Sequence, residues 1–396
     1  MASDSRIPVA IVGAGPAGLM LSHLLARRGI DSIVVEVRSR HEIETANRAG
    51  ILEQGSVSLL VDEGVSDRVL RDGHEHDGIE LRFGGHGHRI DFRRLVDAAV
   101  WLYPQQDVFA DLADARARDG GDVRFEVTDV SVEDHLAAPI LRFTDSSGEK
   151  HVIRADIVVG ADGSRSYCRG LVPESERREY FTTYPYAWLG ILADAPPSAP
   201  ELIYAHSDRG FALISQRTPT VQRMYLQCAP DEDLAQWSDD RIWDELDART
   251  SGDGFELQSG TITEKSILPF RSYVNETMRQ ARLVLVGDAA HTVPPTGAKG
   301  LNLALADVRI LADVIPRALA SGEMDVLDEY SERALDRIWK AESFSYWMTQ
   351  MLHLPPDGEA FDAHRQIGEL RRIVTSDRGS AYLAEAYTGW PEPTRG

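Results

Sequence analysis

The sequence predicts an α/β protein in which a parallel sheet is interrupted along the chain by a separate antiparallel β layer and followed by a helical C-terminal region. Residues 8–15 (PVAIVGAG) form an apolar strand pattern, Pro16 to Arg28 a helical one, and Ser32 to Glu36 a second apolar strand. Strands separated by so short a helix form a βαβ unit, which requires a parallel sheet. Residues 181–270 instead carry short β-rich segments with turn residues between them, and from Gly300 onward the pattern is mostly helical.

Two later segments look like the end of the first strand. Ala155 to Gly160 runs into Ala161-Asp162-Gly163, and Arg282 to Val286 runs into Gly287-Asp288-Ala289. Each is an apolar strand followed by glycine and aspartate. Because ligands of open α/β sheets bind at the carboxyl ends of the strands, these loops predict one ligand site assembled from distant parts of the chain.

The predicted nucleotide-binding domain is therefore discontinuous and Rossmann-like. It comprises residues 1–76, 100–180 and 270–318; the β layer for the substrate comprises 77–99 and 181–269; the helical region comprises 319–396. Helices are expected over residues 301–320, 326–352 and 359–374, with a break at Pro355-Pro356.

The composition limits the partners. The chain has 396 residues and a formal net charge of −21, which argues against nucleic acid or an anionic membrane as partner. It also means that an anionic substrate needs a locally basic pocket. Cys168 and Cys228 are the only cysteines, which fits a reducing cytoplasm, and neither a signal peptide nor an apolar run of membrane-spanning length is expected. We expect no resident metal ion.

A glycine motif marks the first strand–helix turn. Gly13 permits the tight turn, Gly15 lets the backbone approach a pyrophosphate, and Gly18 lets helix and strand pack closely. Glu36 ends the next strand, where its carboxylate can accept ribose hydroxyls. The alternative is a glycine-rich turn that merely connects two elements. The motif does not by itself distinguish NAD from FAD.

The segment from Asp288 to Asn302 favours a flavin. Asp288 follows a strand and precedes a Gly/Pro-rich loop, so it is suited to bind the hydroxyls of a ribityl chain. The run PPTGAKGLN, from Pro294, then opens a helix whose amides and dipole could stabilise negative charge on a reduced flavin. The alternative for Asp288 is a helix cap.

At this point the chain resembles the single-component FAD-dependent aromatic hydroxylases, from about Val9 to Pro391. Four stretches carry the resemblance: Arg48 to Gly55 (RAGILEQG), Glu201 to Tyr204 (ELIY), Gly210 to Arg217 (GFALISQR) and Gly287 to Asn302 (GDAAHTVPPTGAKGLN). The resemblance implies hydroxylation of 4-hydroxybenzoate at position 3, to 3,4-dihydroxybenzoate, with NAD(P)H and O2 through a flavin C4a-hydroperoxide. It also implies a homodimer.

The resemblance also assigns residues to roles. The cofactor contacts that it implies are Glu36, Arg48, Gln105, Asp162 and Asp288, with Thr296, Ala298 and Asn302 along the flavin edge and Arg223 governing movement of the flavin ring. For the substrate it implies Ser215, Arg217 and Tyr225 at the carboxylate, Tyr204 and Tyr387 at the phenol, the carbonyl of Pro295 near the phenolic hydroxyl, and His76 at the outer end of a proton relay.

The residues themselves are compatible with these roles without requiring them. Ser215 and Arg217 share one strand face, and a connection from Thr218 to Gln222 would set Arg217 opposite Arg223 and Ser215 opposite Tyr225. Facing arginines repel unless an anion lies nearby, and arginine is a natural partner for a carboxylate. The alternatives are a surface hairpin with solvated arginines, a core tyrosine at position 204 and a surface histidine at position 76.

Three departures from the family pattern affect the expectations. Val37-Arg38-Ser39-Arg40 follows Glu36, and Arg38 and Arg40 could meet a 2′-phosphate, which favours NADPH over NADH. Ala46 removes a possible cofactor contact, and Ala386 stands beside Tyr387 in place of a polar residue.

The chain has one glycine-rich dinucleotide fingerprint. The nicotinamide would therefore bind transiently, without a nucleotide-binding domain of its own. Two alternatives stay open: the same chemistry on another ring acid, such as an aminobenzoate or dihydroxybenzoate, and a flavin- or dinucleotide-sensing protein without turnover.

Overall fold

The computed structural model describes residues 3–46 and 50–390. Its first sheet confirms the predicted α/β class. β1 (Ser3–Val12) pairs in parallel with β2 (Ser32–Val35) and with β11 (Lys150–Gly160), and β11 pairs in parallel with β18 (Leu283–Leu285). The strand that precedes the glycine turn and the two strands with Gly/Asp ends are therefore neighbours, in the order β18-β11-β1. The sheet is completed by β8 (Asp122–Arg124), β9 (Thr128–Glu133), β10 (Ile140–Thr144) and β17 (Arg279–Gln280).

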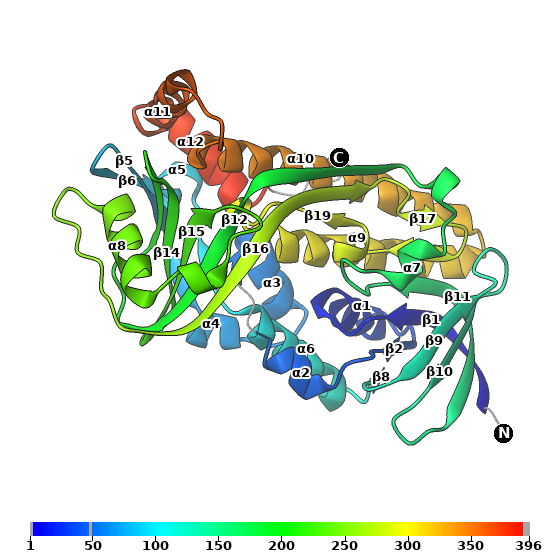
Figure 1. Cartoon of the computed structure of the whole chain (residues 1–396). Helices are drawn as coiled ribbons and strands as arrows, with labels where there is room; N and C mark the ends of the chain where they lie inside the picture. The colour runs from blue at the N-terminus through cyan, green and yellow to red at the C-terminus, as the bar shows by residue number, and fades with distance from the viewer. Residues whose placement is uncertain (1–2, 47–49, 391–396) are drawn as a thin grey trace.

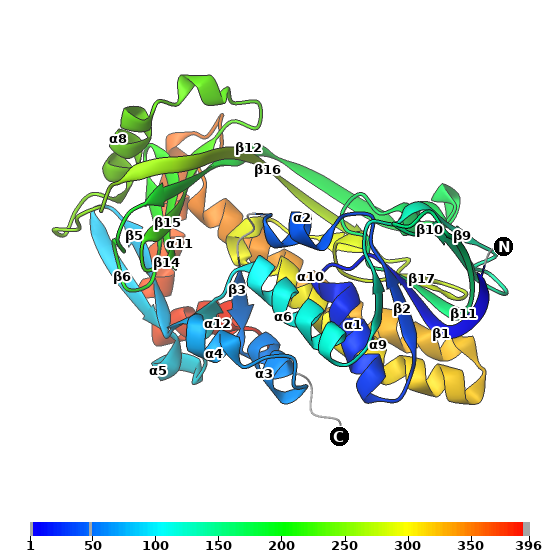
Figure 2. The same ribbon diagram turned by 90° about the horizontal axis from the view of Figure 1, so that it is seen from below.

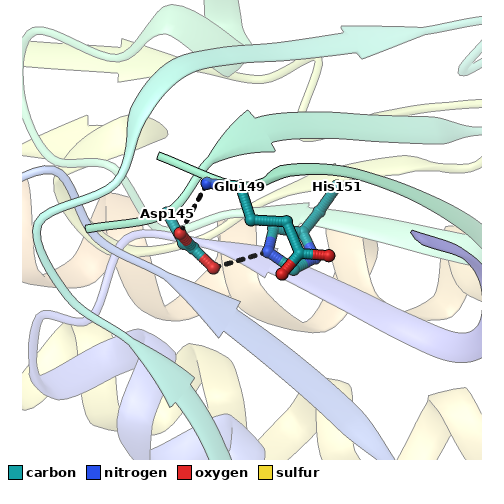
Figure 3. Close-up of side chains that lie close together, drawn as sticks. All are labelled: Asp145, Glu149 and His151. Carbon is teal, nitrogen blue, oxygen red and sulfur yellow. Dashed lines mark hydrogen bonds and ion pairs between the residues drawn. The ribbon is translucent and has the colours of Figure 1, made fainter. Parts of the chain in front are cut away.

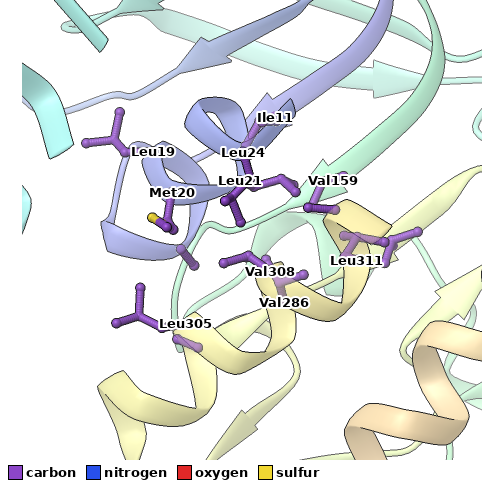
Figure 4. Packing of buried hydrophobic residues seen from close by; sticks show 14 of the residues in the cluster. Ile11, Leu19, Met20, Leu21, Leu24, Val159, Val286, Leu305, Val308 and Leu311 are labelled. Carbon is purple, nitrogen blue, oxygen red and sulfur yellow. The ribbon is translucent and has the colours of Figure 1, made fainter. Parts of the chain in front are cut away.

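Two helices pack together beside this sheet and fix the glycine turn. α1 (Pro16–Arg27) begins directly after the turn, and α9 (Gly300–Ser321) begins after the Gly/Pro-rich loop. Figure 4 shows Leu21 and Val308 from these helices in one cluster with Val159 of β11, and all three side chains are fully buried. Each such side chain contributes about 1.5–3 kcal/mol, so the loops at the strand ends rest on a rigid base.

The second sheet is the predicted β layer. Its strand order is β19-β16-β12-β15-β14-β13-β5-β6. The pairs are antiparallel except β13 with β5, which run parallel. The strands are β5 (Gly78–Phe83), β6 (His86–Asp91), β12 (Glu179–Asp194), β13 (Leu202–Ser207), β14 (Gly210–Thr218), β15 (Val221–Cys228), β16 (Thr261–Asn275) and β19 (His291–Thr292). The long strands β12 and β16 cross from this sheet towards α9 and β17 (Figure 1). α8 (Asp239–Thr250) covers the face turned away from the rest of the protein.

The predicted register of the β14–β15 hairpin is wrong by two residues. Ser215 lies opposite Arg223, and Leu213 opposite Tyr225. The strands continue to Thr218 and from Val221, so the connection is a two-residue turn, and the register shifts between Gln216 and Thr218. A shift of one residue would exchange the two faces of a strand, but a shift of two preserves them. Ser215, Arg223 and Tyr225 therefore keep their common face while their pairing changes, and Arg217 lies within the irregularity.

The C-terminal region is helical, as predicted. α10 (Asp328–Leu352) and α11 (Ala360–Val374) lie where helices are expected, and α12 (Asp377–Thr388) is an additional helix that the sequence pattern did not reveal. In Figure 1, α10 runs along the nucleotide-binding part and brings α11 and α12 against the second sheet.

The remaining elements join these layers (Figure 2). They are α2 (Arg40–Glu44), α3 (Gln54–Asp62), α4 (Arg68–Asp72), α5 (Phe92–Val96), α6 (Gln105–Arg118), α7 (Tyr167–Gly170) and a small sheet of β3 (Ile51–Glu53), β7 (Val100–Leu102) and β4 (His74–His76). Among the described helices, none has the length and apolarity needed to span a bilayer.

Candidate active site

The glycine turn has the shape that a dinucleotide requires. Gly13 has φ +106°, and a Cβ on it would lie 2.3 Å from the carbonyl oxygen of Ala161. A Cβ on Gly18 would lie 2.0 Å from the carbonyl oxygen of Gly13. A Cβ on Gly15, by contrast, would meet nothing within 4 Å. Gly13 and Gly18 thus serve the fold, whereas Gly15 leaves open space in front of the N-terminus of α1, where its amides can bind phosphate.

Glu36 lies beside this turn at the end of β2 and is buried. Its Oε2 accepts a hydrogen bond from the amide of Ala14 at 3.0 Å. Its Oε1 accepts from the amide of Arg38 at 3.1 Å and from the guanidinium of Arg38 at 3.0 Å. The carboxylate is therefore fixed at the turn, and Oε2, which accepts one hydrogen bond, keeps lone-pair capacity for a ribose hydroxyl.

The aspartates after β11 and β18 differ in their surroundings. Asp162 accepts hydrogen bonds from the hydroxyl of Ser166 at 2.5 Å and from the amide of Cys168 at 2.9 Å, so it orders the start of α7. Asp288 is partly exposed in the 3-10 turn Gly287–Ala289 at the end of β18.

A buried ion pair anchors the turn that contains Asp288. Asp307 of α9 accepts hydrogen bonds from the amide of Gly287 at 2.9 Å and from Nε2 of His291 at 2.7 Å. Burial opposes a charge on His291, but the carboxylate of Asp307 raises the pKa of this histidine above its usual value. The turn is thereby attached to α9, whose N-terminus borders the same site.

The Gly/Pro-rich loop presents backbone groups at the start of α9. Pro295 to Gly297 form a 3-10 turn, in which the carbonyl of Pro295 accepts from the amide of Ala298 at 3.0 Å. Ala298 adopts a left-handed conformation with φ +53°. Asn302 is buried and donates to the carbonyls of Ile51 and Ala298, both at 2.9 Å.

Two further predicted cofactor contacts lie near or beyond this loop. Gln105 is the first residue of α6 and is half-buried. Arg48 lies outside the described residues.

Sequence reasoning missed a buried ionic cluster beneath the loop. Lys299 is 1% exposed and donates to Oε1 of Glu53 at 2.6 Å and to the backbone carbonyl of Tyr387 at 3.0 Å. Arg337 donates to Oε2 of Glu53 at 2.8 Å. The partners come from four distant parts of the chain, so no local pattern could have indicated them. The cluster connects the Gly/Pro-rich loop of residues 295–302 directly to the helix that carries Tyr387.

Tyr204 and Tyr387 meet, although 183 residues separate them. Their hydroxyl oxygens lie 2.7 Å apart, and both side chains are 1% exposed. The carbonyl oxygen of Thr296, 3.4 Å from the Tyr204 hydroxyl, is a second acceptor for its hydrogen. Burial raises the pKa of both phenols. Both tyrosines are therefore protonated near neutral pH and can pass hydrogen bonds along, as a relay requires.

The other end of this face is basic. Across the sheet, Leu213 lies between Tyr204 and Tyr225, which puts these tyrosines two strands, or roughly 10 Å, apart. Ser215 donates to the carbonyl of Arg223 at 2.8 Å. Arg217 has a buried Nη1 without a hydrogen-bond partner. Burial lowers the pKa of Arg217, and the positive charge of Arg223 lowers it further. A carboxylate at this end would relieve both effects.

His76 is buried rather than on the surface, which contradicts the simple alternative for this residue. Burial lowers its pKa to about 4, so the imidazole is neutral near pH 7. Its Nδ1 has no hydrogen-bond partner, and no hydrogen bond within 3–46 and 50–390 joins it to Tyr387. Its place as the outer end of a relay stays a prediction.

Aromatic side chains enclose the face between the two polar ends. Trp188 lies 4.5 Å from Tyr225 and 5.5 Å from Phe211, measured between ring centroids. The indole N–H of Trp188 donates to Nε2 of His353 at 2.8 Å. Burial lowers the pKa of His353 to about 3, so this histidine stays a neutral acceptor. These rings pack against one another on the sheet face that also carries Tyr204 and Tyr225.

One carboxylate–imidazole cluster lies away from this site, on the β10–β11 hairpin (Figure 3). Asp145 accepts hydrogen bonds from the amides of Ser147 and Glu149, at 2.9 and 3.0 Å, and from Nε2 of His151 at 2.7 Å. The guanidinium of Arg124 lies 3.3 Å from Nδ1 of the same imidazole. The carboxylate thus has partners within the hairpin, and the nearby positive charge opposes a cation.

Comparisons with known proteins agree with the site. Residues 6–345 match a family model described as FAD binding domain. A p-hydroxybenzoate hydroxylase of Acinetobacter baylyi is 44% identical over 98% of this chain and 96% of its own length. A 6-methylpretetramide 4-monooxygenase of Streptomyces rimosus is 30% identical over 85% of this chain and 80% of its own.

Solved structures show the same fold. A p-nitrophenol 4-monooxygenase from Pseudomonas putida superposes with a TM-score of 0.83 at 19% identity and covers 98% of this chain and 100% of its own. Aklavinone-11 hydroxylase in complex with FAD and aklavinone gives 0.71 at 22% identity, covering 89% and 70%.

Substitution of Gly15 and of Gly18 by alanine should impair different properties of the protein. Gly15→Ala adds its Cβ to open space, so the protein should keep its melting temperature while FAD affinity falls at least roughly tenfold, because the pyrophosphate can no longer approach the backbone. Gly18→Ala drives its Cβ into the Gly13 carbonyl and should lower the melting temperature itself. Thermal denaturation and flavin titration measure the two effects, and unchanged FAD affinity in Gly15→Ala would contradict the assignment.

Proposed function

The chain belongs to the family of FAD-binding aromatic hydroxylases, and on that premise we propose that it hydroxylates 4-hydroxybenzoate at position 3, giving 3,4-dihydroxybenzoate with a reduced nicotinamide and O2. One observation carries the choice of substrate. Tyr204, whose hydroxyl lies 2.7 Å from that of Tyr387 of α12, is on the same sheet as Ser215 and two arginines. A ring with a phenol at one end and a carboxylate at the other matches this arrangement.

At the carboxylate end, Arg217 and Arg223 supply positive charge in a chain whose net charge is −21. The unpaired Nη1 of Arg217 is the donor that a carboxylate oxygen would accept from. Tyr225, buried beside Trp188, adds a hydroxyl and limits the room for larger rings. This end fixes the orientation of the substrate.

At the phenol end, Tyr204 would accept the phenolic hydrogen of the substrate and donate its own to Tyr387. Movement of that proton outward leaves a more electron-rich ring, which an electrophilic oxygen attacks more readily. The buried aromatic walls exclude water from the ring.

The glycine turn, Glu36 and the loop of residues 295–302 would hold FAD. When bound, the flavin supplies the redox chemistry that activates O2 for transfer to the ring. The protein contributes the orientation of the ring, the exclusion of water and the route for the phenolic proton.

Two other functions differ from this one in their requirements. An aminobenzoate or dihydroxybenzoate could occupy the same carboxylate site but would place a different group at Tyr204. A sensing protein needs no buried, hydrogen-bonded tyrosine pair. Comparing nicotinamide oxidation with and without 4-hydroxybenzoate separates an enzyme from a sensor, because a sensor shows no stimulation.

We further propose a homodimer and a cytoplasmic location. Trp339 and Tyr346 of α10 are 41% and 51% exposed, and Tyr180 and Phe181 of β12 are 50% and 62% exposed, so apolar surface is available for a second copy. Light scattering in solution would give the mass of the assembly. Both cysteines are free and buried, which is compatible with a reducing compartment, and cell fractionation would test the location.

For the reductant we propose NADPH. Arg38 is bound to Glu36, and Arg40 to Glu44 and Asp114, so a 2′-phosphate would have to compete with carboxylates for either arginine. The expected kcat/KM is higher with NADPH than with NADH, and Arg40→Gln should narrow the difference. Equal or better kcat/KM with NADH in the unaltered protein would refute the preference.

Arg217→Ala should chiefly impair binding of 4-hydroxybenzoate while FAD content stays normal. Truncation of an arginine that binds a buried carboxylate costs ~2–5 kcal/mol, which corresponds to a roughly thirtyfold or greater loss of affinity. Titration followed by the flavin spectrum measures this. Arg94→Ala, which removes a surface partner of Asp377, is the control. Affinity within twofold of the unaltered protein would place Arg217 outside the site.

Tyr204→Phe should uncouple nicotinamide oxidation from hydroxylation. The substrate still binds through its carboxylate, but its phenol no longer has an outlet for the proton, so hydrogen peroxide should replace most of the product. Peroxide and product are measured together.

Tyr330→Phe controls for the loss of a buried hydroxyl. Tyr330 is fully buried and donates to the carbonyl of Leu285 at 2.8 Å, away from the tyrosine pair. Its removal should cost ~1–3 kcal/mol of stability and leave coupling intact. Full coupling in Tyr204→Phe would remove Tyr204 from the mechanism.

A further inference from the structure

α10 carries buried polar side chains along one face. Glu342, Ser345 and Thr349 are spaced by three and four residues, so they lie on one side of the helix, and they are at most 6% exposed. Burial of so many polar groups is unfavourable unless they bind something specific. The hydroxyl of Thr349 binds that of Thr296, in the loop of residues 295–302.

The loop lies directly on this helix. The hydroxyl of Thr349 lies 2.9 Å from Oγ1 of Thr296 and 2.7 Å from the carbonyl oxygen of Ser345, and these two acceptors share its single hydrogen. Thr296 is 0% exposed. A Cβ added to Gly297 would lie 2.6 Å from Oγ of Ser345, so the backbone of the loop is already in close contact with the helix. Among the described residues, Thr349 is the one hydrogen-bond partner that the Thr296 hydroxyl has.

Thr296 also reaches Tyr204, through its backbone carbonyl. The 3.4 Å between that carbonyl oxygen and the Tyr204 hydroxyl is longer than the 2.5–3.0 Å usual for a hydroxyl donor. The bond from Tyr204 to Tyr387, at 2.7 Å, is of ordinary length. Tyr204 has a single hydrogen, so these two acceptors compete for it.

The two arrangements differ in what they permit. When Tyr204 donates to Tyr387, it can accept a hydrogen from a substrate phenol and pass its own outward. When Tyr204 donates to the Thr296 carbonyl, the chain ends there, because a carbonyl has no hydrogen to pass on. A shorter bond to Thr296 would therefore favour the arrangement that blocks the relay.

We infer that Thr349 is a positioning residue: by binding the hydroxyl of Thr296 it holds the Thr296 carbonyl away from Tyr204 and leaves the Tyr204 hydrogen available to Tyr387. Within the described part of the chain, the Thr349 hydroxyl makes no hydrogen bond to Tyr204 or Tyr387, and it acts only through Thr296. The inference rests on the proposed function, because it concerns the proton that leaves the phenol of 4-hydroxybenzoate.

The test replaces Thr349 by valine, which keeps its shape and removes the hydroxyl. The ultraviolet spectrum of bound 4-hydroxybenzoate, followed against pH in the FAD-loaded enzyme without turnover, reports the ionisation of its phenol. We expect Thr349→Val to raise the pKa of the bound phenol by about one unit, a tenfold change in the ionisation equilibrium. The yield of product per nicotinamide oxidised should fall severalfold, while substrate affinity changes little.

Two controls separate positioning from stability. Thr349→Ser retains the hydroxyl and should behave as the unaltered enzyme. Thr250 is also fully buried and donates to the carbonyl four residues before it, that of Leu246, at 2.7 Å, but lies on α8. Thr250→Val should lower stability and leave the phenol titration unchanged. If Thr349→Val fails to bind FAD, Thr296→Val takes its place, because it removes the other hydroxyl of the same hydrogen bond. The same phenol titration and product yield are then measured.

The outcomes distinguish the inference from its premise. If the unaltered enzyme makes no dihydroxylated product, the proposed function fails. If the unaltered enzyme is coupled and Thr349→Val shows the same phenol titration and product yield, the inference is overturned. An equal shift in Thr250→Val would also overturn it, because the effect would then be one of stability.

Discussion

The parallel pairing of β1 with β11, and of β11 with β18, is the constraint on which the site depends. These strands begin far apart in the chain, and their pairing brings the glycine turn, Asp162 and Asp288 to one edge of one sheet. The clash that a Cβ on Gly13 would make with Ala161 shows how closely β1 and β11 meet at that edge. The cofactor site is thus a product of sheet topology and needs no long segment of its own.

The proposed substrate site depends on a different kind of assembly. Its floor is a face of the second sheet, but Tyr387 comes from the last helix, and the loop of Thr296 belongs to the nucleotide-binding part. Buried polar contacts join these pieces: Lys299 to the carbonyl of Tyr387, and Thr349 to Thr296. Because a buried polar group without a partner is costly, these contacts select one relative placement of cofactor loop and phenol site.

The sequence predicted what local patterns can encode. Strand and helix periodicity predicted the two sheets and helices α9 to α11. The Gly/Asp ends indicated which strands lie side by side. The family resemblance indicated which tyrosines approach each other. The pairing of Ser215 with Arg223 was missed because the strand ends and the irregularity after Gln216 depend on the turn at Pro219. Lys299 and Glu53 lie 246 residues apart, so only the folded chain reveals their contact. The cofactor and substrate roles of the individual side chains stay predictions.

The most direct test of the proposed function is isotopic. The FAD-loaded protein is supplied with 4-hydroxybenzoate, reduced nicotinamide and O2 labelled with the heavy oxygen isotope, in ordinary water, and the product is identified by mass spectrometry and NMR. The account predicts 3,4-dihydroxybenzoate that carries one labelled oxygen, on the carbon next to the original phenol. Nicotinamide oxidation that 4-hydroxybenzoate does not stimulate, or a product labelled from water or at another ring position, would contradict it.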